Sequence, residues 1–240
     1  MKQILIIIFF MLELVGYAQN RYSEHEVTYN KSDSLFYLKS NMKPLNGIVY
    51  SEFGDRCNYI DGKEDGIHNL WYNNGQLWQK LNFHLGILHG SYKVWYENGQ
   101  LKHVGGYFKG QNNGLSKSWY KNGQLDNVKY FKNGKFDGLY STWYENGNLS
   151  SERNFANGKL DGLSRTWYEN GNLSSVRNYK NDVLNGLFRD YHKNGQLSKE
   201  CTYYDGKKNG NWLIWHENGQ LYGHKNYSHG KLIIDLFNNQ

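Results

Sequence analysis

A seven-residue motif recurs seven times at a constant spacing of 24 residues, and this period constrains the fold more than any other feature of the chain. The fourth copy is WYENGNL and begins at Trp143. The other copies begin at Trp71, Trp95, Trp119, Trp167, Tyr191 and Trp215. A fixed period of this length predicts a stack of similar structural units, each packed on its neighbours.

Each copy contains an Asn-Gly pair, which predicts a tight β-hairpin. A two-residue type I′ turn needs positive φ at both central residues, and Asn and Gly adopt positive φ at the lowest cost. We therefore expect a structural role for the turn glycines Gly75, Gly99, Gly123, Gly147, Gly171, Gly195 and Gly219. In this register Tyr144 faces Leu149 and Trp143 faces Ser150. The tryptophans then lie on one face of the sheet, and the leucines and motif tyrosines lie on the other.

The same register pairs a glycine with an aromatic residue at the base of each hairpin. In the fourth repeat the pair is Gly138 and Phe155. The remaining pairs are Gly66–Phe83, Gly90–Tyr107, Gly114–Phe131, Gly162–Tyr179, Gly186–Tyr203 and Gly210–Tyr227. A ring over a cross-strand glycine covers backbone that would otherwise be exposed, so we expect each ring to lie on its glycine.

A second set of turns, 24 residues apart, closes the other end of each unit. Asn157-Gly158 is one example, and we expect this turn to be the looser of the two. Two turns per repeat leave two strands per repeat. The predicted fold is all-β, an elongated single-domain stack of about seven 24-residue hairpins in one antiparallel meander. A single proline, 27 glycines and 17% aromatic residues agree with a repetitive β-protein.

Three segments are expected along the chain. Residues 1–18 combine Lys2, a short apolar run and a small residue at Ala18, which predicts a signal peptide cleaved near Ala18 and export to the periplasm, the outer surface or the medium. The apolar run is shorter than the roughly 20 residues of a membrane-spanning helix. Residues 19–46 form a polar N-terminal segment with one capping strand near 34–39. Residues 47–237 hold a partial leading hairpin, the repeats and a terminal capping strand.

The two cysteines occupy equivalent places in distant repeats. Cys57 and Cys201 are separated by six periods. A disulfide needs Cα atoms within about 7 Å, whereas twelve strands at about 4.8 Å separate the two residues in a linear stack. We predict no intrachain disulfide.

The repeated residues resemble the MORN repeat superfamily, and in particular its bacterial variant with the pattern G-x-x-x-x-W-Y-x-N-G-x-L. Members of that variant are often labelled YwqK-type antitoxin repeat proteins. The resemblance covers about residues 47–237. It implies a β-hairpin stack used for protein–protein contact or, in some eukaryotic members, for proximity to membranes.

No catalytic, metal or cofactor motif is found in the sequence. His84 and His89 lack the companion ligands of a zinc site, and no phosphate loop, nucleophile elbow or C-x-x-C pair is present. His192 and His216 replace the motif tyrosine, and we expect them to take over its packing. These observations disfavour an enzyme and predict no cofactor.

Three functional hypotheses follow from the repeats. The first is an exported scaffold or adaptor that binds another protein. The second is a module that binds an extended glycan, the cell wall or a membrane surface through a ladder of Trp71, Trp95, Trp119, Trp143, Trp167 and Trp215. The third, from the family label, is an immunity protein or antitoxin. The net charge of +6 is interleaved with acidic residues, and export further disfavours nucleic acid as the partner. Whether the tryptophan face is packed or exposed stays open.

Overall fold

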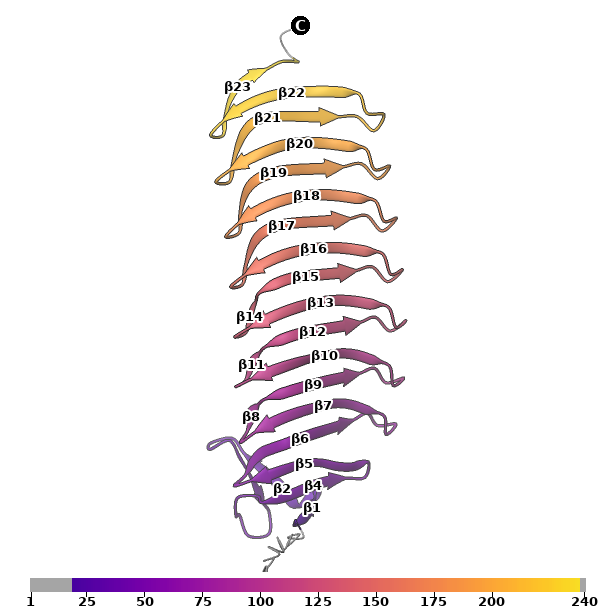
Figure 1. Ribbon diagram of the computed structural model, residues 1–240. Coiled ribbons are helices and arrows are strands. Elements are labelled where there is room, and N and C mark those ends of the chain that lie inside the picture. Colours follow the sequence, from indigo (N-terminus) through magenta and orange to yellow (C-terminus); the bar gives the residue numbers. More distant parts are fainter. Residues whose placement is uncertain (1–18, 238–240) are drawn as a thin grey trace, which may run out of the picture.

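The computed structural model describes residues 19–237 as one long, open β-sheet (Figure 1). The sheet contains 21 strands, and β2 and β3 form a separate two-stranded hairpin. From β5 to β22 each long strand pairs antiparallel with the long strands before and after it, and the short strands β8, β11 and β14 each pair with the strand before. The predicted all-β meander of stacked hairpins is therefore confirmed. The segment assigned to a signal peptide, 1–18, lies outside the described residues.

The elements follow the 24-residue period closely. The N-terminal elements are β1 (Arg21–Ser23), the short 3-10 helix η1 (Glu24–Glu26), β2 (Val27–Asn30) and β3 (Leu35–Leu38). The first hairpins are β4 (Gly47–Ser51), β5 (Gly54–Ile60), β6 (Lys63–Trp71), β7 (Leu77–His84), β8 (Ile87–Leu88), β9 (Gly90–Trp95), β10 (Leu101–Phe108), β11 (Gln111–Asn112), β12 (Gly114–Trp119) and β13 (Leu125–Lys132). The others are β14 (Lys135–Phe136), β15 (Gly138–Trp143), β16 (Leu149–Ala156), β17 (Lys159–Trp167), β18 (Leu173–Lys180), β19 (Val183–Tyr191), β20 (Leu197–Tyr204), β21 (Lys207–Trp215), β22 (Leu221–Ser228) and β23 (Lys231–Asp235).

The turn inside the motif has three residues, so the predicted two-residue type I′ turn is wrong here. The Tyr144 N–H donates to the Asn148 carbonyl at 2.8 Å, and the Gly147 N–H donates to the Tyr144 carbonyl at 2.9 Å. Gly147 has φ +87°, whereas Asn146 does not have positive φ. A turn that ends with a glycine in the left-handed region is the usual three-residue hairpin loop. All seven motif glycines have positive φ.

The type I′ turn lies at the opposite end of each unit, where a looser turn was expected. Asn157 has φ +52° and Gly158 has φ +85°. The flanking residues Ala156 and Lys159 pair directly, which leaves a two-residue loop. The Gly158 N–H also donates to the carbonyl of Phe136, at 2.7 Å in the preceding repeat. The tighter turn therefore also joins successive repeats.

The predicted glycine–aromatic pairs are all present in the register, but the ring does not explain the glycine. Gly162 pairs with Tyr179, yet it has φ +99° and its missing Cβ would point toward Asn154 in the preceding strand. Residues 161–163 bulge opposite Asn154, whose Nδ2 donates to the Leu163 carbonyl at 2.8 Å. A β-bulge that requires positive φ is the reason for the glycine.

A second bulge moves the leucine row to the tryptophan side of the sheet. Thr142 pairs with Ser151, but Trp143 pairs with Leu149, which leaves Ser150 as an extra residue. Directly paired residues point to the same face, so the expected separation of tryptophans and leucines is wrong. We call the side of Trp143 the tryptophan face. The side of Thr142 and Phe155 is the ring face.

Hydrophobic burial is concentrated at the N-terminal end of the stack. Leu45, Val49, Cys57 and Tyr59 are at most 4% exposed and form one cluster. Tyr22, Val27, Phe36 and Leu38 pack against it from the N-terminal segment. That segment is more elaborate than the single predicted capping strand, because β1 pairs parallel with β4 and the β2–β3 hairpin adds a second layer.

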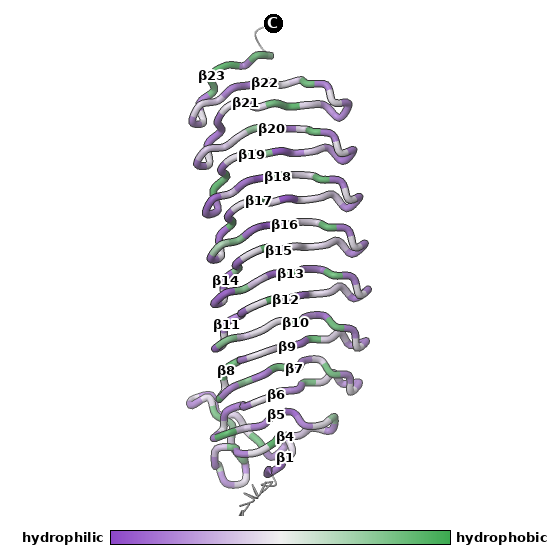
Figure 2. Tube along the Cα trace, viewed as in Figure 1, coloured by the Kyte–Doolittle hydropathy of each residue, from purple (hydrophilic) through white to green (hydrophobic). Residues whose placement is uncertain are grey.

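The repeats themselves form a single layer. Their most buried side chains are mostly small and polar: Ser116, Asn127, Ser141, Ser151, Ser164 and Ser175. Figure 2 shows hydrophobic residues as short stretches scattered along the stack. Each strand makes its main contacts with its immediate neighbours in the meander. Both faces of the repeat sheet are therefore available to a partner.

Candidate functional site

The predicted tryptophan ladder lies on the tryptophan face at the ends of the strands. All six tryptophans of the ladder are half-buried, neither enclosed nor fully exposed. The carbonyl of Trp167 accepts a hydrogen bond from the Tyr144 hydroxyl of the preceding repeat at 2.8 Å. The backbone carbonyl at this position therefore helps to join successive repeats, while part of each indole ring faces solvent.

Exposed apolar side chains lie on the same face, near the opposite ends of the strands that end with the tryptophans. Ile67, Leu115 and Leu139 occupy equivalent places in three repeats and are 46%, 40% and 39% exposed. Residues 139, 141 and 143 alternate along β15, so Leu139 and Trp143 share a face. The tryptophan face thus presents a periodic apolar surface.

The ring face carries cations among aromatic rings. Lys129 and Arg153 lie at equivalent places in successive repeats and are both half-buried. Within residues 19–237 neither has a carboxylate partner. The Lys129 Nζ lies 5.9 Å and 6.0 Å from the ring centroids of Phe131 and Tyr140. One repeat further on, Arg177 differs, because it pairs with Asp190 at 3.2 Å.

A serine–histidine contact on the ring face was not foreseen from the sequence. The His103 Nδ1 lies 2.6 Å from the Ser118 Oγ, and its Nε2 contacts the Tyr92 hydroxyl. Burial lowers the pKa of His103 and favours the neutral imidazole. Both ring nitrogens are engaged with neighbours, and no carboxylate of the described residues bonds to the imidazole as in a hydrolase triad. The contact stabilises the sheet face. The cross-strand pairing of His103 with Ser118 is a signal that could have found it.

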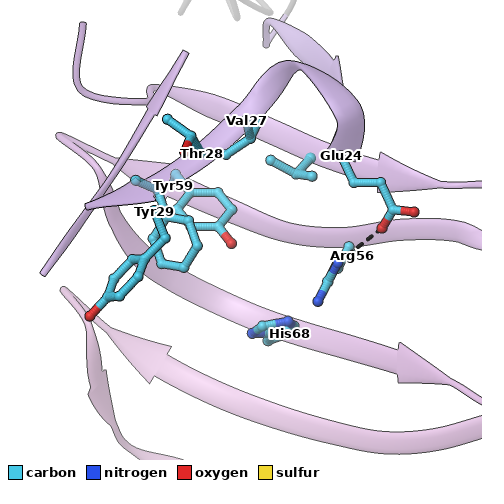
Figure 3. A pocket seen from close by; sticks show the side chains of 9 residues that line it. Glu24, Val27, Thr28, Tyr29, Arg56, Tyr59 and His68 are labelled. Atoms are coloured by element: carbon cyan, nitrogen blue, oxygen red, sulfur yellow. Dashed lines mark hydrogen bonds and ion pairs between the residues drawn. The ribbon is translucent and has the colours of Figure 1, made fainter. Parts of the chain in front are cut away.

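The N-terminal cap contains a small cavity, shown in Figure 3. We call it the cap pocket. It measures about 260 Å³ and lies between the β2–β3 hairpin and the ring face of β5 and β6. Its lining residues are Glu24, Val27, Thr28, Tyr29, Phe36, Val49, Arg56, Tyr59 and His68. An ion pair of 2.9 Å between the Arg56 Nη1 and the Glu24 Oε2 closes one side.

His68 is the unusual residue of the cap pocket. The residue is 9% exposed, and neither ring nitrogen has a hydrogen-bond partner in the described chain. The nearest carboxylate oxygen, from Glu64, is 3.6 Å from Nδ1, which is beyond hydrogen-bonding distance. Burial raises the pKa of Tyr59, so its hydroxyl stays protonated. This arrangement could not be predicted from the sequence, because Glu24, Val27 and Phe36 come from a cap without a repeat pattern.

The described residues contain no cluster of three or more histidines, cysteines or carboxylates suited to a metal ion. Cys57 on β5 and Cys201 on β20 are both buried, free thiols. Within residues 19–237, no helix is both long and apolar enough to cross a bilayer.

Comparison with protein-family models gives seven matches to one family, described as a MORN repeat variant. The matched segments are residues 64–84, 88–109, 112–135, 136–157, 160–181, 184–204 and 208–229. Together they cover more than half of the chain. A search of curated proteins found no match.

Proposed function

The chain belongs to the MORN repeat variant family, and from this premise we propose that it is a non-catalytic binding module that docks a protein partner along its tryptophan face. MORN repeats are generally binding and interaction modules and are generally not catalytic. The proposal rests on one observation. Ile67, Leu115 and Leu139 stand exposed on the same face as the tryptophan row, and no second layer of the repeats covers this face. Periodic apolar surface of this kind is typical of protein-interaction sites.

The repeat architecture suits an extended partner. Several equivalent shallow contacts in a row add their free energies when the partner can reach them together. An extended partner would meet an apolar residue at this place in five of the seven repeats, Ser91 and Asn211 being the exceptions. Binding then depends on how many repeats are engaged more than on any single side chain.

Site-specific crosslinking tests which face docks the partner. A photoreactive phenylalanine analogue replaces Leu139 in one variant and Tyr140 in the other. These neighbours point to opposite faces of β15. We expect a discrete protein adduct from position 139 and none from position 140, in cells that express the chain naturally. Adducts only from position 140 would contradict the assignment of the face.

Deletion of whole repeats tests the extended surface. Removal of residues 137–160 takes out one full period and preserves the register on both sides. We expect each such deletion to weaken binding of the crosslinked partner stepwise. If binding instead survived two deletions and was abolished by one substitution, the site would be local.

A second candidate, an extended acidic glycan on the ring face, is favoured by Lys129 and Arg153. Both cations are half-buried beside aromatic rings and lack carboxylate partners in the described chain. Half-burial weakens their hydration, which strengthens their attraction for an anion. The test is retention on an immobilised acidic polysaccharide. The double variant K129Q/R153Q should elute at lower salt than wild type, while K93Q/K117Q, on the tryptophan face, should be retained better than K129Q/R153Q.

The proposal places this binding outside the cytoplasm, after residues 1–18 are removed. The support is the charge and hydropathy pattern of this segment. N-terminal sequencing of the chain from a Gram-negative host should give Gln19 as the first residue. Recovery of an intact N-terminus from the cytosol would contradict export.

A further inference from the structure

We propose that the cap pocket binds the phenol ring of a tyrosine side chain presented by a partner polypeptide. The proposal goes beyond docking on the tryptophan face, because the pocket is formed by the N-terminal cap on the opposite face of the sheet. It rests on the size of the cavity, its aromatic walls and the unpartnered imidazole of His68.

The size and walls of the cavity fit one aromatic side chain. At about 260 Å³ it is smaller than the 300–1,000 Å³ that drug-sized ligands occupy. The ring centroid of Phe36 lies 4.9 Å from that of Tyr29 and 4.9 Å from that of Tyr59. Val27 and Val49 complete the apolar lining. Aromatic rings pack favourably on such walls in tilted arrangements.

The polar groups of the cavity favour a ring that carries a hydroxyl over one that does not. Buried polar side chains are almost always hydrogen-bonded, and His68 has no protein partner for either nitrogen. A neutral imidazole offers one donor and one acceptor, and a phenolic hydroxyl complements either. The Tyr59 hydroxyl also lines the cavity and makes no hydrogen bond with the described protein. A phenylalanine side chain would leave these groups unsatisfied.

The charges of the cavity favour a neutral ring over a phosphorylated one. Arg56 is already paired with Glu24 at 2.9 Å, so the rim has no free positive charge. Glu64 lies beside His68 and would repel a phosphate group. An anionic ligand would have to displace the Arg56–Glu24 pair, whereas a tyrosine ring would not.

Two small probes test the selection on the full chain. N-acetyl-tyrosinamide and N-acetyl-phenylalaninamide differ by one hydroxyl, and each is titrated while the imidazole resonances and the backbone amide resonances of β5 and β6 are followed by NMR. We expect the His68 signals to shift with the tyrosine probe, and the phenylalanine probe to bind about tenfold more weakly, as one hydrogen bond predicts. Equal affinities, or no shift of His68 up to the solubility limit, would overturn the proposal.

Two variants test whether His68 is responsible for the preference for the tyrosine probe. His68→Phe should fold, because it replaces an unpartnered polar ring by an apolar one, and it should lose the preference for the tyrosine probe. His216→Phe, the same replacement outside the pocket, should keep the preference. A preference that survives His68→Phe would contradict the assignment. If His68→Phe does not fold, the comparison of the two probes on wild type still decides. Crosslinking at position 139 reports separately on the tryptophan face, so either proposal can fail alone.

Discussion

The hydroxyl of Tyr144 donates a hydrogen bond to the carbonyl oxygen of Trp167, 2.8 Å away in the next repeat. The same bond joins the other repeats, from Tyr72, Tyr96, Tyr120 and Tyr168. His192 replaces the tyrosine and still reaches the Trp215 carbonyl, with its Nε2 at 2.9 Å. The motif tyrosine is therefore a link between repeats, and His192 makes the same contact as the tyrosine that it replaces.

Removal of this bond should weaken the stack measurably. Tyr144→Phe deletes the hydroxyl and leaves the ring, so we expect a loss of about 1 kcal/mol in the free energy of unfolding. Tyr130→Phe is the matched control, because Tyr130 is 45% exposed and makes no hydrogen bond with the described chain. Urea denaturation followed by circular dichroism measures both. Equal stabilities would show that the bond contributes nothing.

The two kinds of Asn-Gly turn should respond differently to the same substitution. The Asn146 side chain accepts from the Asn148 N–H at 2.9 Å and donates to the Glu169 carbonyl at 3.0 Å. Asn146→Gly removes both bonds and should cost about 2 kcal/mol. Asn157 has φ +52°, which glycine adopts readily, so Asn157→Gly should change stability by less than about 1 kcal/mol. Thermal melts measure both variants. If Asn157→Gly lowered the melting temperature more than Asn146→Gly, the assigned turns would be contradicted.

The glycine of the motif turn should not tolerate a β-branched residue. Gly147 has φ +87°, and Gly147→Val should cost about 1–2 kcal/mol or more. Glu145→Gln, in the same turn, should cost almost nothing because Glu145 is exposed. Thermal melts of the two variants give the comparison. Similar melting temperatures would mean that the loop can adopt another conformation.

The two thiols should stay reduced and protected. Burial raises the pKa of Cys57 and of Cys201 from 9.0 to about 12. Iodoacetamide should therefore label neither thiol in the folded protein at pH 8 and label both in urea. Non-reducing mass spectrometry should find no bridge between them. An intrachain disulfide would require the stack to fold back on itself.

The same pKa shifts predict the direction of the pH dependence. The unfolded chain ionises its thiols near pH 9, whereas the folded chain holds them protonated to about pH 12. The folded state therefore binds more protons in this window, so stability falls as the pH rises from 9 toward 12. Cys57→Ala/Cys201→Ala should show a shallower decline in urea melts over this range. An unchanged slope would show that the thiols do not contribute.

The 24-residue period was sufficient to predict the meander, the number of repeats and every glycine–aromatic pair. It could not distinguish the two turns, because Asn146-Gly147 and Asn157-Gly158 are the same dipeptide. In the motif turn the Asn146 side chain accepts a hydrogen bond from the Asn148 N–H, and the equivalent asparagine makes the same bond in all seven motif turns. The dipeptide alone does not show which of the two turns will use the side chain in this way.

The faces of the sheet were harder to predict than its strands. A one-residue bulge at Ser150 moves Leu149 beside Trp143, and no residue type at this place marks a bulge in advance. The site around His68 could not be predicted from the sequence. Its pocket requires Glu24, Val27 and Phe36 from a segment without repeats, whose fold depends on contacts that are distant in sequence.

The hydrophobic cluster at the N-terminal end makes the two ends of the stack differ in stability. The cap around Leu45 and Tyr59 has a second layer, whereas the repeats beyond it gain stability only from adjacent strands. In such one-dimensional systems local opening becomes easier with distance from the best-stabilised unit. Backbone amides should therefore exchange with deuterium in a gradient, slowest near β5 and fastest near β22. A partner that binds along several repeats would flatten this gradient and slow exchange most at the end far from the cap.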